Sequence, residues 1–256
     1  MSRFSNLEFR GDSEEQSEST PLVKDETFYQ QESQAAYESG NFEQALRSYA
    51  KVLEYNPQNT AAWAGQVKML IELREFHEAK LWAEKALEQF PHDPELLAAK
   101  AVSLARLGDI DNALAFSDAA VEERGDTSYV WLARGDVLLA AKRKQADSCI
   151  ERALSRSGNW FVRWLASRIY YYHQKFSLAL KMAQQALSQD AARCILWLQL
   201  GHCQAALGFD SVAVTSFQQA LQLNPQCREA ATASTKLSRV GPVRRFIRLC
   251  RGALQR

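Results

Sequence analysis

Few side chains in this sequence could bind a metal ion or act as a nucleophile, and they lie far apart. Among its 256 residues the chain has four histidines and five cysteines: His77, His92, His173, His202, Cys149, Cys194, Cys203, Cys227 and Cys250. The sequence has no His-Glu-x-x-His or Cys-x-x-Cys zinc motif and no glycine-rich phosphate loop. His202 and Cys203, with Cys194 nine residues earlier, form one local group of soft ligands, but neighbouring helical residues point in different directions. We therefore predict that the chain is not an enzyme and has no catalytic residue, metal site or cofactor.

The elements that carry these side chains recur every 33 or 34 residues. An alanine marks each copy, at Ala45, Ala79, Ala113, Ala146, Ala179 and Ala213. A large residue precedes each alanine, at Tyr29, Trp63, Leu97, Trp131, Trp164 and Trp197. Such a period indicates a small unit that must stack on its neighbours to bury its apolar face. Apolar residues at helical spacing, interrupted by turns such as Gly40-Asn41 and Gly108-Asp109, predict a helix, a turn and a second helix in each unit.

The repeat carries a recognisable pattern, clearest between Trp63 and Pro91 and in the sixth unit. The sixth unit has Trp197, Leu200, Gly201, Gly208, Ala213, Phe217, Ala220 and Pro225. In these residues the chain resembles the tetratricopeptide repeat (TPR) family. The resemblance implies an all-α, right-handed superhelical solenoid of six helix-turn-helix repeats, at residues 26–59, 60–93, 94–127, 128–160, 161–193 and 194–227. The fourth and fifth units are one residue short, and we assign the missing residue to the turn between their helices.

In the family geometry the first helix of each unit lines a concave groove. The first three units place mixed side chains there, whereas the last three place mostly apolar ones, at Tyr129, Leu132, Asp136, Leu139, Val162, Leu165, Ile169, Tyr172, Ile195, Leu198 and His202. An exposed apolar patch of this kind marks an interaction site, and it would suit a helical, partly apolar peptide or protein segment. A small shift in helical phase would instead place Leu132 and Leu165 in the core, so both readings stay open.

One ligand of the family can be tested against the sequence. Heat-shock co-chaperones of this family bind a C-terminal carboxylate with Lys and Asn on the first helices of consecutive units. The corresponding residues here are Gln30, Gln34, Gly65, Glu95 and Ala99, or, one unit further on, Ala64, Lys68, Ala99, Tyr129 and Ala133. Neither set matches, so we expect no chaperone binding through a carboxylate clamp.

The two ends of the chain carry opposite charges. Residues 1–25 contain six acidic and three basic residues in a polar stretch, which predicts a disordered tail. Residues 228–240 predict a helix that caps the last unit. Residues 241–256 predict a basic amphipathic helix with Arg244, Arg245, Arg248 and Arg251 beside an apolar face. That helix could pack back on the solenoid, bind an anionic membrane surface, or bind an acidic protein; nucleic acid is disfavoured because aromatic residues do not alternate with the arginines.

Composition is typical of a water-soluble helical protein, with 46% hydrophobic and 24% charged residues. The sequence has no visible secretory signal and no apolar run of membrane-spanning length, which favours a cytoplasmic location, or a peripheral one at the inner face of a membrane. The sequence therefore predicts a non-catalytic scaffold or adaptor that binds a peptide or protein segment in its groove. The alternative is a regulatory or recruiting subunit of a larger enzyme or membrane-associated complex, tethered by the basic helix.

Overall fold

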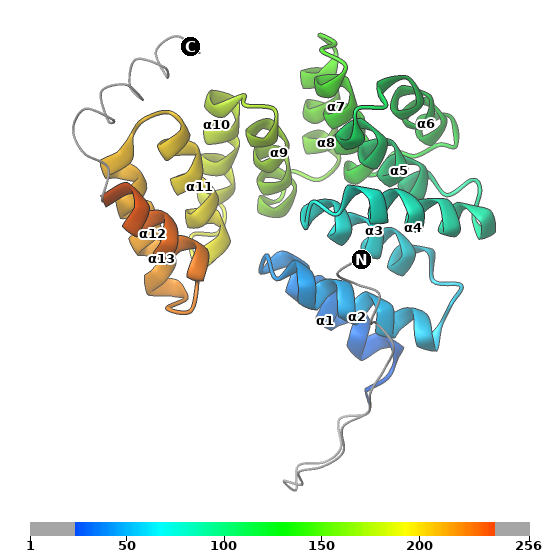
Figure 1. Cartoon of the computed structure of the whole chain (residues 1–256), viewed down its shortest axis with the longest axis horizontal. Coiled ribbons are helices and arrows are strands. Elements are labelled where there is room, and N and C mark those ends of the chain that lie inside the picture. The colour runs from blue at the N-terminus through cyan, green and yellow to red at the C-terminus, as the bar shows by residue number, and fades with distance from the viewer. Residues whose placement is uncertain (1–23, 239–256) are drawn as a thin grey trace, which may run out of the picture.

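The structure, a computed structural model, describes residues 24–238. The predicted basic helix 241–256, with Arg244, Arg245, Arg248 and Arg251, lies outside these residues, as does most of the predicted N-terminal tail. The described part of the chain consists of helices and the turns that join them (Figure 1). Its thirteen helices are α1 (Glu26–Glu38), α2 (Phe42–Tyr55), α3 (Thr60–Glu72), α4 (Phe76–Gln89), α5 (Pro94–Leu107), α6 (Ile110–Glu122), α7 (Ser128–Ala140), α8 (Ala146–Arg156), α9 (Trp160–Tyr172), α10 (Phe176–Leu187), α11 (Cys194–Ala206), α12 (Asp210–Leu223) and α13 (Arg228–Ser238).

Helices α1 to α12 form six consecutive pairs that stack side by side, and the fold class is the predicted all-α solenoid. Helix α13 follows the last pair and buries Ala230 and Leu237 against Phe217 and its neighbours in α12. It covers the apolar face that the last pair would otherwise expose to water. The division of residues 26–227 into six family repeats follows these pairs but stays our interpretation.

Short polar residues start many of the helices. The side chains of Asn59, Asp93 and Asn159 each accept a hydrogen bond from a backbone amide in the first turn of the following helix, at 2.9 to 3.0 Å. These caps satisfy amides that have no partner within the helix. The turn inside each pair contains one residue with positive φ, namely Gly40, Arg74, Gly108, Lys142, Gln174 and Gly208. The chain therefore reverses direction at the same point in every pair, even where glycine is missing.

The recurring alanines are buried, which lets the helices of a pair approach closely. Ala45, Ala79, Ala113, Ala179 and Ala213 are fully buried and Ala146 is nearly so. Two glycines on first helices also allow close approach: a Cβ atom on Gly65 would lie 2.5 Å from the ring of Tyr49 in the preceding pair, and one on Gly201 would lie 2.6 Å from the ring of Phe217 in its own pair. Small residues facing aromatic ones give the interdigitation that a dense core requires.

The prediction that the fourth and fifth units have shortened turns between their helices is wrong. Residues 141–145 join α7 to α8, so this connection is longer than the three-residue turn 39–41 between α1 and α2. Helix α8 is short instead, with 11 residues, and it begins at Ala146 without a side-chain cap. In the fifth unit the turn 173–175 is three residues long, as is the turn 39–41 in the first unit. The missing residue is absorbed by the helices because the reversal of the chain needs its full length.

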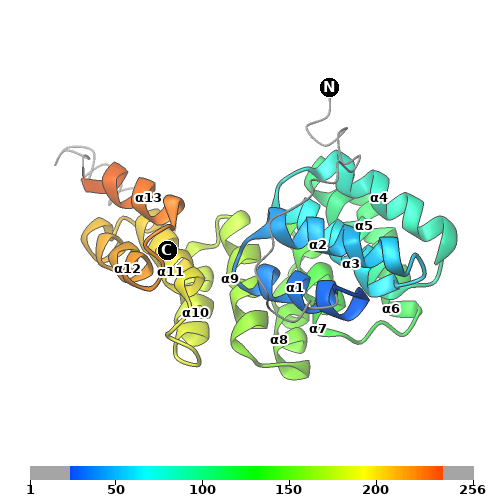
Figure 2. The same ribbon diagram turned by 90° about the horizontal axis from the view of Figure 1, so that it is seen from below.

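The stack curves until its first two pairs meet the fifth and sixth, and ends of α1 and α2 approach α9 (Figures 1 and 2). We call this contact the seam. It consists of the ring contacts Tyr37–Phe161 and Phe42–Trp164, the ion pairs Glu72–Arg168 and Glu38–Arg193, and the approach of Gly40 to Ile195. One core cluster includes both Tyr37 and Trp164, so the described part of the solenoid closes into a ring.

Candidate functional site

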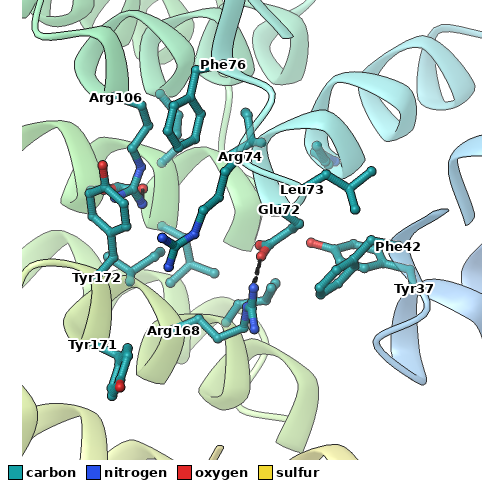
Figure 3. Close-up of a pocket in the computed structure, with 18 of the residues that line it drawn as sticks. Tyr37, Phe42, Glu72, Leu73, Arg74, Phe76, Arg106, Arg168, Tyr171 and Tyr172 are labelled. Carbon is teal, nitrogen blue, oxygen red and sulfur yellow. Dashed lines mark hydrogen bonds and ion pairs between the residues drawn. The ribbon is translucent and has the colours of Figure 1, made fainter. Parts of the chain in front are cut away.

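Two adjoining cavities lie on the concave face of the ring. The first, the arginine cavity, has a volume of about 570 Å³ and is lined by the first helices of successive pairs and by the turn that carries Arg74 (Figure 3). The second, the amide cavity, has a volume of about 870 Å³ and is lined largely by α1 and by the start of α3, α7 and α9. Both cavities are lined by Tyr37, Lys68, Tyr129, Leu132 and Leu165. These shared residues make the two cavities neighbours in one continuous concave surface.

Most of the groove residues predicted from the sequence lie at these cavities. Eight of the eleven line one or both of them: Tyr129, Leu132, Asp136, Val162, Leu165, Ile169, Tyr172 and His202. The other three, Leu139, Ile195 and Leu198, line neither cavity. Whether any of the eleven binds a partner stays a prediction.

The apolar groove residues are less accessible than expected. Leu132 is 2% exposed and Leu165 is 9% exposed, because they pack in the same core cluster as Tyr37 of the first pair. Tyr172 differs from them, with 40% of its surface exposed at the arginine cavity. Leu132 and Leu165 therefore belong to the core, and the cavities beside them have mixed polar and apolar linings.

The arginine cavity contains a cluster of paired charges around Asp136. Asp136 is almost fully buried and accepts a hydrogen bond of 2.6 Å from Nη2 of Arg106, while its other oxygen lies 2.6 Å from Nε2 of His173. The Arg106 guanidinium also stacks on the ring of Tyr172, with its central carbon 3.2 Å from the ring centroid. A buried carboxylate needs this degree of pairing to remain charged.

Two further ion pairs cross the concave face. Arg168 donates from Nε to Glu72 at 2.9 Å, across the seam. Lys68 donates to Glu95 at 2.5 Å, and its ammonium lies 4.0 Å from the centroid of the Tyr129 ring. Cation–π contact and ion pairing together hold the Lys68 side chain in place.

The hydroxyls of the buried tyrosines are proton donors at physiological pH. Burial raises the pKa of Tyr129 well above its ordinary value, and the carboxylate of Glu95 adds to the effect. Burial likewise raises the pKa of Tyr37, with a further contribution from Glu72. Both phenols therefore stay protonated and can donate hydrogen bonds to an occupant of the cavities.

The amide cavity has a different lining. Its polar side chains are mostly uncharged amides and hydroxyls: Thr27, Gln30, Gln31, Gln34, Asn59, Thr127, Ser128 and Ser157. Amides and hydroxyls can both donate and accept hydrogen bonds, as a peptide backbone does. This surface is suited to an extended polypeptide backbone.

The soft-ligand group considered from the sequence is dispersed in the structure. Cys203 is buried, and burial raises the pKa of its thiol to about 12. His202 instead reaches the arginine cavity and lies 3.0 Å from a carboxylate oxygen of Glu229 in α13. Within residues 24–238 no three side chains of the metal-binding types gather closely enough to hold an ion. Nor does any helix in that range have the length and apolarity needed to cross a bilayer.

Several residues of the site did not stand out in the sequence. Arg74 lies in a turn, where the repeat pattern carries no expectation, and Glu72 and His173 read as ordinary surface residues. Arg168 occupies a position where the resemblance to TPR proteins implies a small residue, and this departure marks it in the sequence. Its partner Glu72 is 96 residues away in the chain, and no local pattern joins two residues at that separation.

Solved structures of repeat proteins resemble this fold. A TPR protein of Thermus thermophilus, TTC0263, matches with a TM-score of 0.54 and 19% identity over 70% of this chain and 99% of that chain. Human IFIT1, solved as a dimer with m7Gppp-AAAA, matches with a TM-score of 0.52 and 20% identity over 84% of this chain and 56% of IFIT1. At these identities the likeness concerns the fold. No curated protein matches the sequence.

A family model described as tetratricopeptide repeat matches residues 7–157, which is more than half of the chain. The match includes the first four helix pairs, with the caps, buried alanines and turns described above. The chain belongs to the tetratricopeptide repeat family.

Proposed function

We propose that this protein is a non-catalytic interaction scaffold that binds a segment of a partner protein in the two cavities on its concave face. The observation that carries the proposal is the size of the concave space, since both cavities fall in the range of about 300–1,000 Å³ that is common for ligand sites. Concave surfaces built from the first helices of stacked repeats are extended binding surfaces by their geometry. The TPR family membership supports a role in protein–protein interaction.

An extended segment suits this space better than the helical, partly apolar one expected from the sequence. The apolar anchors that a helix would need to contact, such as Leu132 and Leu165, are already covered. The amide cavity instead offers side chains such as Gln34 and Ser128 that can pair with a backbone. The proposed ligand is therefore an extended polypeptide segment whose backbone N–H and C=O groups are not hydrogen-bonded to each other.

The test is a selection of random decapeptides displayed on phage against the full chain, followed by measurement of Kd for synthetic copies. Gln34→Trp places a bulky side chain in the amide cavity and should weaken binding of the selected peptides at least tenfold. The matched control is Gln58→Trp, which changes an exposed glutamine outside both cavities and should leave Kd unchanged. Equal binding by wild type and Gln34→Trp would contradict the proposal.

The tethered-subunit alternative depends on residues 241–256, which lie outside the described residues. It predicts that the full chain sediments with vesicles containing phosphatidylserine and that a chain lacking residues 241–256 does not. Peptide binding in the cavities should be the same for both chains. A cytoplasmic location, or one at the inner face of a membrane, stays a prediction.

A further inference from the structure

Two cysteines occupy corresponding places at the start of neighbouring units near the C-terminal end of the stack. Cys194 is the first residue of α11, and Cys227 directly precedes α13. In the first two units these places are taken by Glu26, the first residue of α1, and by Asn59, which caps α3. Asn59 donates a hydrogen bond of 2.9 Å to Glu26, and the two residues of each pair are 33 positions apart. The stacking of units therefore brings side chains at these two places into contact.

At the end of the stack this contact joins two thiols. Cys194 and Cys227 are both free and partly buried, and both pack against the core cluster that contains Phe217. Their side chains interact directly with each other. Cys149 and Cys203 differ from them, because each is buried within its own helix pair. The position in the repeat and the shared packing place one pair of accessible thiols side by side.

The surroundings favour a bond between the two sulfurs over a metal ion. Burial raises the pKa of the Cys194 thiol well above its ordinary value, and the neighbouring Cys227 raises it further. A metal ion would need thiolates and further ligands, and residues 24–238 contain no group of three suitable side chains. A disulfide instead removes both protons and leaves no charge in the partly buried site.

A covalent link here would act on the least securely anchored helix of the stack. Helix α13 has two buried residues, Ala230 and Leu237. Three of its hydroxyl groups donate to the backbone carbonyl four residues earlier, a bond that slightly destabilises helices: those of Thr232, Thr235 and Ser238. A terminal helix with so little buried surface opens more readily than the helices inside the stack.

We infer that Cys194 and Cys227 form a redox-sensitive pair, which a low-molecular-weight disulfide such as oxidised glutathione converts into an intramolecular disulfide that links the start of α13 to the start of α11. One thiolate attacks the small disulfide and releases one glutathione, and the other attacks the mixed disulfide and releases the second. The protein loses two protons and two electrons, and both appear in two molecules of reduced glutathione. The link holds in place the helix that carries Glu229, which lines the arginine cavity and lies 3.0 Å from His202. This inference goes beyond the proposed function and does not depend on it.

The experiment exposes the full chain to oxidised glutathione at about pH 8.5, near the ordinary pKa of a thiol. Remaining thiols are alkylated, and the disulfides are located by mass spectrometry of proteolytic peptides. Cys194→Ser and Cys227→Ser each remove one member of the pair. Cys250→Ser is the matched control, since Cys250 is the cysteine outside the described residues and a competing partner for Cys227.

Wild type and Cys250→Ser should both yield the link between Cys194 and Cys227. Oxidation should slow hydrogen exchange of the α13 amides at least tenfold in these two proteins, and a reducing agent should reverse the change. The same treatment should not slow exchange in Cys194→Ser or Cys227→Ser. Each protein is compared with its own reduced form, so any effect of the substitution on the fold cancels.

Three results would overturn the inference: stable mixed disulfides with glutathione at both cysteines, a link from Cys227 to Cys250, or unchanged exchange of α13 after the link has formed. The proposed function is tested separately, because binding of the selected peptides is measured on reduced protein. Under those conditions Cys194→Ser should bind them with the Kd of wild type, whether or not the disulfide forms on oxidation.

Discussion

The helix stack and the seam are held together in different ways. Inside the stack, neighbouring helices meet along their length through buried alanines such as Ala79 and Ala113, in the same manner in each pair. At the seam, side chains from helix ends of the first two pairs, Phe42 and Glu72, meet Trp164 and Arg168 on α9. The stack therefore depends on residues that recur in every unit, whereas the seam depends on residues that each occur in a single unit.

This difference makes closure of the ring a separate event from formation of the solenoid. A stacked repeat array gains its stability from contacts between neighbouring units. The seam adds a small contact between distant units, and side chains of the seam such as Glu72 and Arg168 line the arginine cavity. Changes in the stack should affect stability strongly, whereas changes in the seam should affect the shape of the ring more than its stability.

The largest effect is expected for Phe217→Ala in the stack. Phe217 is fully buried against Gly201 and α13, and removal of its ring leaves a cavity that the helices cannot close. The free energy of unfolding should fall by about 3–5 kcal/mol. Urea unfolding followed by circular dichroism measures this change. A fall of less than about 1 kcal/mol would mean that the end of the stack can collapse around the gap.

The matched change at the seam, Phe42→Ala, should cost less. The Phe42 ring is half-buried and stacks on Trp164 with centroids 6.3 Å apart. Loss of an aromatic pair and of partial burial should lower the free energy of unfolding by about 1–2 kcal/mol. The same urea experiment measures it beside Phe217→Ala. Equal losses for the two phenylalanines would show that the seam is as much a part of the core as the stack.

The seam ion pair is expected to contribute about 1 kcal/mol, because its side chains are only partly exposed. Glu72→Gln, Arg168→Gln and the double variant form a thermodynamic cycle that isolates the coupling between the two side chains.

Glu72→Arg should open the ring by placing two like charges together, and small-angle X-ray scattering should then report a larger radius of gyration. Exchange of the charges in Glu72→Arg/Arg168→Glu is the control and should restore it. An unchanged radius in Glu72→Arg would show that the aromatic contacts alone keep the ring closed.

The stack could be predicted from the sequence because each unit repeats the same pattern of small and large buried residues. The alanine period correctly located the second helices, for example α4 with Ala79 and α6 with Ala113. The seam could not be predicted, since the separation of Glu72 from Arg168 leaves no periodic signal. Leu132 is buried in the core, which is one of the two readings that the sequence left open.

The candidate site shows the same division. Tyr129 and Tyr172 were predicted from their place on the first helices, which the period fixes. Arg74 lies in a turn, where the pattern constrains only the backbone. Whether a described carboxylate pairs with it depends on where the acidic residues of other units lie, and only the three-dimensional arrangement gives that.

The smallest effect is expected for an ion pair inside the stack, Lys68 with Glu95. Burial alone would raise the pKa of Glu95, but the charge of Lys68 and hydrogen bonds from Lys68 and Thr127 outweigh it, so this pKa lies below its ordinary value. A lowered carboxyl pKa stabilises the fold above the pKa of the unfolded chain, about 4.3, and that contribution is lost as the pH falls through the folded value. Glu95→Gln should therefore cost about 1 kcal/mol or less at pH 7 and nothing near pH 3.

Urea unfolding at pH 7 and near pH 3 measures this convergence, with the exposed Glu88 changed to Gln as the control. The pair joins α3 to α5, neighbours in the stack, whereas Glu72 and Arg168 join units far apart. Loss of the Glu95 pair should consequently leave the radius of gyration unchanged, while loss of the Glu72 pair should increase it. A larger radius in Glu95→Gln would show that the curvature of the stack itself, and not the seam, sets the closure of the ring.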